Sequence, residues 1–251
     1  MPKAKLEPGE MPLDYSASRV VLAKLSENAK QIKNAKALYR TTVSYDGSRS
    51  SFRYSLLCAP ESMRLEMLPL NSAYALSIVI VRDGKALLLD TQERSARFAV
   101  SAQELLKRNI GFPLGIEELC AHLLGRPSQR ELQEISDADI GMTTLSDSAA
   151  GLVTELVIVR PHNHKLSISS ASGLLSAMEV YSEFTGKLDL SATFGAVKSF
   201  ESVQVPTQVS FSLSSVGASV SMQLVAFGSG KALDQARFNL EIPAGYKLLP
   251  G

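Results

Sequence analysis

Histidines are the residues of this chain with the most obvious capacity for chemistry. His162 and His164 share the segment RPHNHK, and His122 lies earlier, in ELCAHLLG. Two histidines in a tight turn could hold a zinc ion, but such a site needs further protein ligands. The sequence offers no obvious third ligand, so we expect no metal site. His122 has apolar neighbours on a short helix, and we expect it to face solvent.

Other motifs of catalysis are weak. The segment GSGK at 228–231 lacks the earlier glycine of a phosphate loop and the Ser or Thr that would follow its lysine. No nucleophile elbow and no pair of catalytic carboxylates is recognisable. We therefore predict no catalytic residue, no cofactor and no enzymatic activity. A lipid hydrolase is the weaker alternative, which a loss of activity on changing a histidine would support.

Two cysteines, Cys58 and Cys120, are too few for a disulfide framework or a zinc site. Two buried free thiols are the favoured interpretation. A disulfide is the alternative if the protein occupies an oxidising compartment.

Composition limits the class of partner. The 26 basic and 25 acidic residues of the 251-residue chain nearly cancel, so we expect no binding to nucleic acid. Hydrophobic residues make up 45% of the chain, aromatic residues only 6%, and tryptophan is absent, so a cavity would have aliphatic walls suited to acyl groups. The longest apolar run, ALSIVIV at 75–81, is too short to span a bilayer. The first fifteen residues do not resemble a signal peptide, so if the protein belongs in a cell envelope, its export signal is expected to be missing from this sequence.

The elements expected from periodicity are mostly strands. Residues 1–15 predict a disordered arm and 16–36 an amphipathic helix, after which the hydrophobic period drops to two. Strands are expected at 38–45, 51–58, 63–68, 74–81, 86–90, 96–100, 152–160, 165–171 and in five later segments that include RFNLEIP. Short turns such as DGSRS and RDG between them predict an antiparallel meander with one apolar face and one solvated face. We predict a single domain over 16–251.

A helical hairpin interrupts the strands at 101–125. Ser101 and Glu104 form a capping box, and the segment GFPLGIEELCAHLLGRP places apolar residues on one side of a second helix, which Gly125 ends. Residues 128–150 are polar and predict a surface excursion. A long antiparallel sheet with one apolar face must curl. The predicted fold is therefore mainly β (α+β): a single curved antiparallel sheet forming an open or incomplete β-barrel with a helical lid.

Several segments carry a resemblance to a known family. They are MRLEMLPLNS, ALLLDTQERSARFAVSAQELLKRNIGFPLGIEELCAHLLGRP, VPTQVSFSLSS and the closing FNLEIPAGYKLLPG. Together they resemble the outer-membrane lipoprotein carrier and receptor family, the Lol system of Gram-negative envelopes, of which this chain looks like a divergent LolA/LolB-like member. The resemblance implies an open β-barrel with a helical lid over an apolar cavity that holds acyl chains. It also implies a place in the periplasm or at the periplasmic face of the outer membrane.

The family resemblance and the alternation of apolar and polar residues in the strands together predict a candidate binding face. The receptor member of the family has a loop whose exposed leucine touches the membrane, and Leu70 is the matching position here. The side chains that we expect to contact ligand are Phe52, Tyr54, Leu56, Met63, Leu65, Met67, Tyr74, Leu76, Ile78, Ile116, Leu119 and Leu123. The expected partners are acyl chains of lipoproteins or lipids, with the membrane surface and other envelope transport proteins as further candidates, and the chain is expected to be a monomer. The alternative is a structural or interaction module of an envelope complex, in which this face is a filled core.

Overall fold

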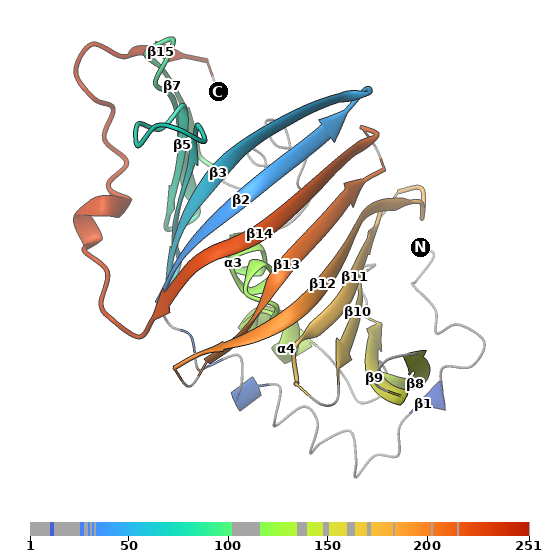
Figure 1. Cartoon of the computed structure of the whole chain (residues 1–251). Helices are drawn as coiled ribbons and strands as arrows, with labels where there is room; N and C mark the ends of the chain where they lie inside the picture. Colours follow the sequence, from blue (N-terminus) through green and yellow to red (C-terminus); the bar gives the residue numbers. More distant parts are fainter. Residues whose placement is uncertain are drawn as a thin grey trace. The chain divides into compact units, whose positions relative to one another are not determined.

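The computed structural model describes residues 11–12, 26–27, 30, 32, 34–101, 116–134, 140–147, 151–159, 164–169, 172–182, 184–201, 203–214 and 216–250. The chain forms two compact units: unit 1 takes in Met1–Gln31 and Ala121–Gly217, and unit 2 takes in Ile32–Cys120 and Ala218–Gly251. The described residues of both units are mostly antiparallel strands (Figure 1), so the predicted mainly β fold class is confirmed.

Unit 2 is a sheet in the order β14-β2-β3-β4-β5-β6-β7-β15. Its strands are β2 (Ala35–Tyr45), β3 (Ser48–Ala59), β4 (Ser62–Leu68), β5 (Ser77–Arg82), β6 (Lys85–Asp90), β7 (Ser95–Ala99), β14 (Ala218–Ser229) and β15 (Lys247–Leu249). Neighbours pair antiparallel, except that β15 runs parallel to β7. The helix predicted over 16–36 ends too late, because Ala35 and Lys36 already belong to β2. Ser26, Glu27 and Lys30 are helical, and the other residues of 16–31 lie outside the described part.

Turn chemistry explains the meander. Asp46 and Gly47 join β2 to β3 with φ of 48° and 71°, and Asp83 and Gly84 join β5 to β6 with φ of 51° and 75°. Two successive residues with positive φ match the right-handed twist of the flanking strands, and Asp-Gly tolerates this conformation best. The hairpins predicted from DG and RDG are therefore confirmed.

The two faces of unit 2 are both partly covered. One, named here the Tyr54 face, carries Tyr54, Leu56, Leu65 and Val79. The other, the Leu57 face, carries Leu57 and residues in register with it.

The Leu57 face was expected to be solvated, and this prediction is wrong. Phe238, fully buried, packs with Leu57, Ile80 and Leu233. It belongs to the 3-10 helix η2 (Gln235–Phe238), in a segment where RFNLEIP had predicted a strand. The C-terminal segment thus crosses the Leu57 face, and β15, which follows it in the chain, lies beside β7 (Figure 1). Alternation within a strand identifies two faces but does not show which distant segment covers one of them.

Unit 1 contains antiparallel strands in the order β1-β8-β9-β10-β11-β12-β13, and the strands of both units belong to one continuous sheet, as predicted. Its strands are β1 (Met11–Pro12), β8 (Ile140–Asp147), β9 (Gly151–Val159), β10 (His164–Ser169), β11 (Leu175–Tyr181), β12 (Leu188–Phe200) and β13 (Val203–Leu213). Helix α3 (Ile116–Leu123) crosses the sequence boundary between the units, and α4 (Gln129–Glu134) follows. Residues 128–150 are therefore not a plain surface excursion, since they contain α4 and β8, and Met11–Pro12 of the expected disordered arm pairs with β8.

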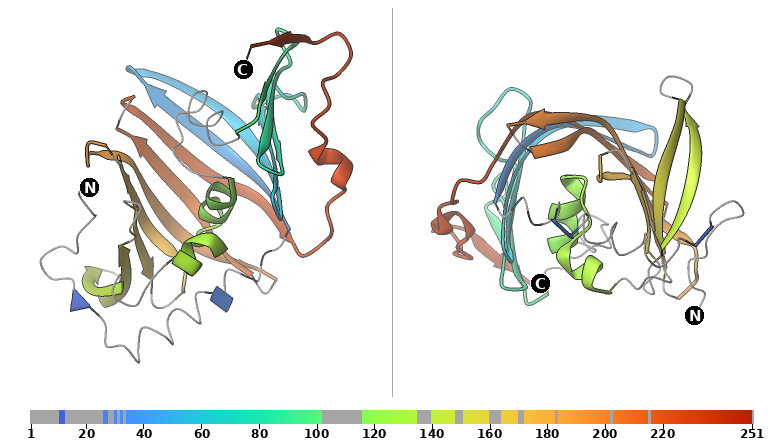
Figure 2. Two further views of the ribbon diagram at one scale, coloured as in Figure 1. Left: turned by 180° about the vertical axis from the view of Figure 1, so that it is seen from behind. Right: turned by 90° about the horizontal axis from the view of Figure 1, so that it is seen from below.

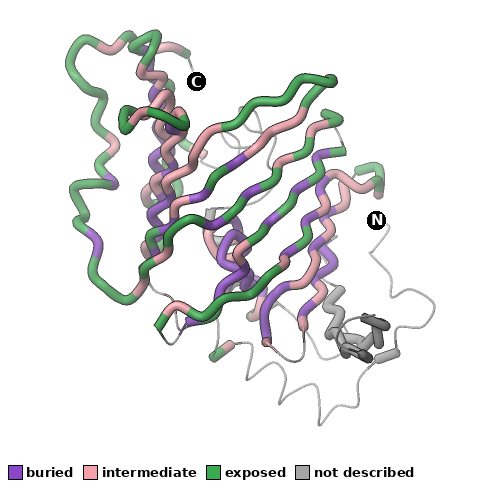
Figure 3. Tube along the Cα trace, viewed as in Figure 1, coloured by how far each residue is buried: buried purple, intermediate pink, exposed green. Residues whose placement is uncertain are grey.

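One face of unit 1 is a continuous apolar core. Along β13, buried Val209, Phe211 and Leu213 alternate with exposed Ser210 and Ser212. Buried and exposed stretches alternate along the strands in the same way in Figure 3. The register continues this face into the neighbouring strands. Its fully buried members on β10, β11 and β12 include Leu166, Met178, Leu190 and Ala192.

Gly125 fixes the end of α3 on unit 1. Its N–H donates to the His122 carbonyl at 2.8 Å, its own carbonyl accepts from the N–H of Leu175 at 2.8 Å, and its φ is 71°. A Cβ at this position would lie 2.6 Å from Cδ of Pro206 on β13. Figure 2 shows α4 and the end of α3 on one side of β10–β13. The predicted stop at Gly125 is confirmed, and the first helix of the predicted hairpin lies outside the described residues.

Candidate functional site

A disulfide joins the Tyr54 face to α3. Cys58 of β3 and Cys120 of α3 are bonded, with their Cα atoms 6.1 Å apart. The interpretation of two free thiols is therefore wrong, and the alternative holds. The sequence could not decide this, because pairing depends on the distance between residues that are 62 positions apart in the chain. The bond holds α3 to β3 at this point.

Six of the predicted ligand-contacting residues share the Tyr54 face. On β3 these are Phe52, Tyr54 and Leu56, and the register pairs Tyr54 with Met67 and Leu56 with Leu65 of β4. Met63 pairs with Cys58 and completes the set. Sequence reasoning did not include Tyr39 of β2 or Val79 of β5, although both lie on the same face.

Exposure changes along this face. Near the disulfide, Leu56 and Met63 are 1% and 0% exposed. At the other end of the same strands, Phe52, Tyr54 and Met67 are half-buried. Burial raises the pKa of the Tyr54 hydroxyl, so that side chain is neutral at physiological pH. The end of the face away from the disulfide is the part that a ligand could reach first.

Three further predicted residues do not lie on this face. Ile78 pairs with Glu66 and Leu89, so it lies on the Leu57 face, where it packs against the cluster that contains Phe238. Because Ile78 and Val79 are both apolar, alternation could not assign their sides. Tyr74 and Leu76 precede β5, which begins at Ser77 rather than at the predicted 74, and Tyr74 is 86% exposed.

The loop between β4 and β5 is held in a defined conformation. The Arg53 guanidinium donates to the Pro69 carbonyl at 3.2 Å and to the Ser72 carbonyl at 2.6 Å. The N–H of Leu76 donates to the Met67 carbonyl at 2.7 Å and closes the loop. Leu70, which is 43% exposed, therefore sits with Tyr74 on an anchored loop.

The predicted residues of α3 are only partly described. Leu119 and Leu123 are buried, each 4% exposed, whereas the side chain of Ile116 lies outside the described part. His122, which we expected to face solvent, is fully buried. It lies one position before Leu123, and its polar ring is accommodated because a carboxylate stands beside it.

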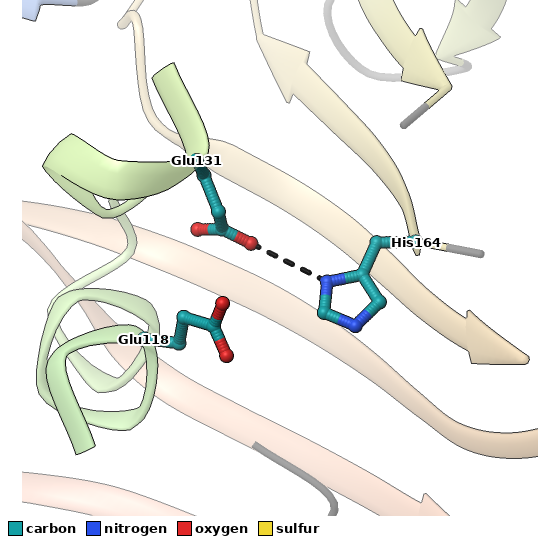
Figure 4. Close-up of side chains that lie close together, drawn as sticks. All are labelled: Glu118, Glu131 and His164. Carbon is teal, nitrogen blue, oxygen red and sulfur yellow. Dashed lines mark ion pairs between the residues drawn. The ribbon is translucent and has the colours of Figure 1, made fainter. Parts of the chain in front are cut away.

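That carboxylate belongs to Glu131 of α4. Its Oε2 lies 2.7 Å from Nε2 of His122 and accepts from the N–H of Ser128 at 2.8 Å. Its Oε1 lies 3.5 Å from Nδ1 of His164 on β10 (Figure 4). His162 lies outside the described residues, so the proposed histidine pair is not tested.

The electrostatics of Glu131 favour its charged form. Burial by itself raises the pKa of the carboxyl, but the charge and hydrogen bond of His122 and the hydrogen bonds of His164 and Ser128 outweigh burial and place that pKa well below its ordinary 4.5. A buried ionised group is tolerated only with such partners. The group therefore connects the end of α3, α4 and β10.

Sequence reasoning missed Glu131 although a signal was present. Ser128 and Glu131 have the spacing of a capping box, and the N–H of Glu131 donates to Oγ of Ser128 at 3.1 Å while the Ser128 N–H donates to the glutamate. This motif predicts the start of α4. It does not predict that His122 and His164 would meet the same carboxylate.

Comparison with known proteins shows the fold. No family model and no curated protein matches the chain. Solved structures do match: a DUF1329 family protein from Desulfovibrio piger has a TM-score of 0.58 at 9% identity and covers 91% of this chain and 98% of its own. A domain named for outer-membrane lipoprotein sorting, from Vibrio parahaemolyticus, has a TM-score of 0.57 at 11% identity and covers 90% and 97%.

A third structure extends the comparison. A LolA superfamily protein from Nitrosomonas europaea has a TM-score of 0.54 at 12% identity and covers 88% of this chain and 97% of its own. The chain thus has the fold of the lipoprotein-sorting and LolA superfamily structures, and the family resemblance seen in the sequence is confirmed at the level of fold. Among the described helices, none is long and apolar enough to cross a membrane.

Proposed function

We propose that this chain binds acyl chains of a lipoprotein or lipid without covalent chemistry and carries them within the cell envelope. The observation that supports the proposal is the exposure gradient of the Tyr54 face, which is sealed at Leu56 and Met63 and half-open at Phe52, Tyr54 and Met67. This partial exposure is confined to β3 and β4, since Tyr39 and Thr41, which pair with Tyr54 and Phe52, are buried. The shared fold with a domain named for lipoprotein sorting supports the same ligand class.

The energetics of acyl binding suit this face. Each methylene that leaves water contributes about 0.8 kcal/mol, so a chain that fits only in part still competes with water. Met67 is unbranched and adapts to irregular ligands, and the half-buried rings of Phe52 and Tyr54 can reorient around a chain. Specificity for a single shape is therefore not expected.

The disulfide supports an envelope location. Structural disulfides persist in oxidising compartments such as the periplasm and are rare in the cytosol. Cys58 and Cys120 are bonded. We place the protein in the periplasm or at the periplasmic face of the outer membrane, where it acts as a monomer and meets other envelope transport proteins.

The anchored loop after β4 supports contact with a membrane. Leu70 and Tyr74 are exposed there, and three hydrogen bonds from the Arg53 guanidinium to backbone carbonyls hold the loop in place. An apolar side chain and an amphipathic ring on a fixed loop suit the membrane–water interface. Leu70 and Tyr74 would bring the half-open end of the Tyr54 face to its source of lipid.

The second candidate is an interaction module with a filled interior. The near-zero exposure of Leu56, Met63 and Val81 favours it, because it shows that part of the Tyr54 face is solid core. The same fold could then serve only to present loops to a partner. The carrier function requires that lipid enters beside Phe52, whereas the interaction module requires no lipid there.

The test is a native mass measurement of the protein purified under mild conditions, with extraction and identification of bound lipid. Phe52→Asp places a charge on the half-open end of the Tyr54 face, while Ser51→Asp places the same charge on the adjacent, exposed position of β3. The carrier function predicts bound fatty acid or phospholipid that Phe52→Asp removes and Ser51→Asp retains. A lipid-free mass, with no uptake of a fluorescent fatty acid by the folded protein, would favour the interaction module.

A further inference from the structure

Thr41 is a polar residue in an apolar setting. It lies on β2 and is 0% exposed, and its register partners are Phe52 on β3 and Met222 on β14. Residues at i and i+2 of a strand share a side, so Thr41 lies on the Tyr54 face beside Tyr39. Among the residues that the structure describes, the Oγ1 atom of Thr41 has no hydrogen-bond partner.

An unpartnered buried hydroxyl is costly. Buried polar side-chain atoms are nearly always hydrogen-bonded, and an orphan loses its solvation without compensation. Valine has almost the same shape, favours strands equally and would remove this cost. The neighbouring position, Thr42, differs: it is on the other side of β2, and its hydroxyl is 3.1 Å from that of Ser51. Within the described part of the chain the hydroxyl of Thr41 therefore lacks a partner, and a bound molecule could supply one.

The half-open end of the Tyr54 face gives access to that hydroxyl. Phe52, directly opposite Thr41, is half-buried, and its ring makes an edge contact with the ring of Tyr54 at 5.1 Å between centroids. A molecule that enters beside Phe52 would therefore come next to the position of Thr41 on β2. Such a molecule must be apolar for most of its length, because the surrounding side chains are, and it must bring one hydrogen-bond acceptor.

We propose that the Oγ–H of Thr41 donates a hydrogen bond to the ester or amide carbonyl oxygen at the head of an acyl chain bound on the Tyr54 face. This inference rests on the proposed function and specifies its ligand as an acyl ester or amide rather than a bare hydrocarbon. A neutral carbonyl can accept the one hydrogen bond that a hydroxyl donates, and it carries no charge to be buried, so it suits this site.

The test compares Thr41→Val with Thr42→Val as the matched control. Two probes are titrated into delipidated protein: a pyrene-labelled fatty acid methyl ester and the corresponding pyrene-labelled alkane of equal length. Thr41→Val is expected to weaken ester binding about tenfold, the equivalent of one hydrogen bond in a buried site, and to leave alkane binding unchanged. Thr42→Val is expected to bind both probes like the wild type.

Thermal unfolding of the ligand-free protein gives a second, independent measurement. Because Thr41→Val removes an unsatisfied hydroxyl without changing shape, its melting temperature is expected to equal or exceed that of the wild type. A lower melting temperature would show that the hydroxyl already has a partner in the folded chain and would overturn the proposal.

The binding outcomes separate this inference from the function on which it rests. If the wild type binds both probes and Thr41→Val changes neither affinity, the carrier function stands and the role of Thr41 is wrong. If the wild type binds neither probe, both are wrong. Equal losses for ester and alkane in Thr41→Val would indicate altered packing and would also reject the hydrogen bond.

Discussion

Cys58 of β3 is bonded to Cys120 of α3 across 62 residues of sequence. The helix that was predicted to form part of a lid is thus covalently held to the strand that carries Phe52, Tyr54 and Leu56. While the bond is intact, Cys120 cannot leave β3, so under the proposed function a ligand would enter at the half-open end rather than under this part of α3.

Removing the disulfide should lower stability substantially. Closing a loop of this length restricts the unfolded chain by about 4 kcal/mol in the chain-entropy model. Replacing Cys58 and Cys120 with serine should therefore lower the urea midpoint of unfolding. Reductant should lower the midpoint of the wild type and leave that of the double variant unchanged; equal midpoints for oxidised and reduced wild type would show that the bond contributes nothing.

Glu131 should make the fold sensitive to acid. Its pKa in the folded protein lies well below the ordinary 4.5, so its contribution to stability is complete above about 4.5 and is lost as pH falls below that value toward the folded pKa. Urea unfolding followed from neutral pH downward should show this loss in the wild type.

Glu131→Gln tests the same group at constant pH. Removing the buried carboxylate takes away the hydrogen-bond partner of the buried His122 ring, so it should cost about 1 to 3 kcal/mol at neutral pH and should flatten the loss of stability in acid. Glu241→Gln, at an exposed position, is the control. If both variants follow the acid profile of the wild type, Glu131 does not cause the sensitivity.

Gly125 should not tolerate a side chain. Gly125→Ala and Gly84→Ala both place alanine at positive φ, which costs about 1 kcal/mol, but only the first has Pro206 Cδ at 2.6 Å from the new Cβ. We expect Gly125→Ala to be more destabilising by about 1 to 3 kcal/mol in chemical unfolding. Pro206→Ala should recover part of that difference in the double variant; equal costs at the two glycines would mean that α3 does not end against β13.

The C-terminal segment should be part of the folding unit. Phe238→Ala removes a fully buried ring from the Leu57 face and should cost about 3 to 5 kcal/mol. Phe184→Ala, at a ring that is 92% exposed, should change the free energy of unfolding by less than about 0.5 kcal/mol. Similar values for both variants would indicate that the segment is not packed in solution.

The β4–β5 loop should determine membrane affinity. Exchanging Leu70 and Tyr74 for alanine should weaken sedimentation with phosphatidylethanolamine–phosphatidylglycerol vesicles about fivefold or more, because apolar area at the interface is lost. Leu248→Ala, at a leucine that is 60% exposed elsewhere in unit 2, should bind like the wild type. Equal losses in the two proteins would remove the special role of the loop.

Features that depend on neighbouring residues could be predicted from the sequence. Asp-Gly pairs specify hairpins because few residues accept positive φ, and Gly125 ends α3 for the same reason. The alternation in β3 and β4 placed Phe52, Tyr54 and Leu65 on one side because the strand period is two. Such signals can be read without knowing which distant residues come into contact.

Features that depend on distant residues were decided only by the tertiary structure. The bond between Cys58 and Cys120, the burial of Phe238 on the Leu57 face and the meeting of His122 with Glu131 each join segments that the local pattern treats separately. Ile78 shows the limit within a single strand, since two adjacent apolar residues leave the side undetermined. The sequence determines which side chains are apolar and which need a hydrogen-bonding or charged partner. Which residue becomes that partner depends on the segments that the fold brings within contact distance.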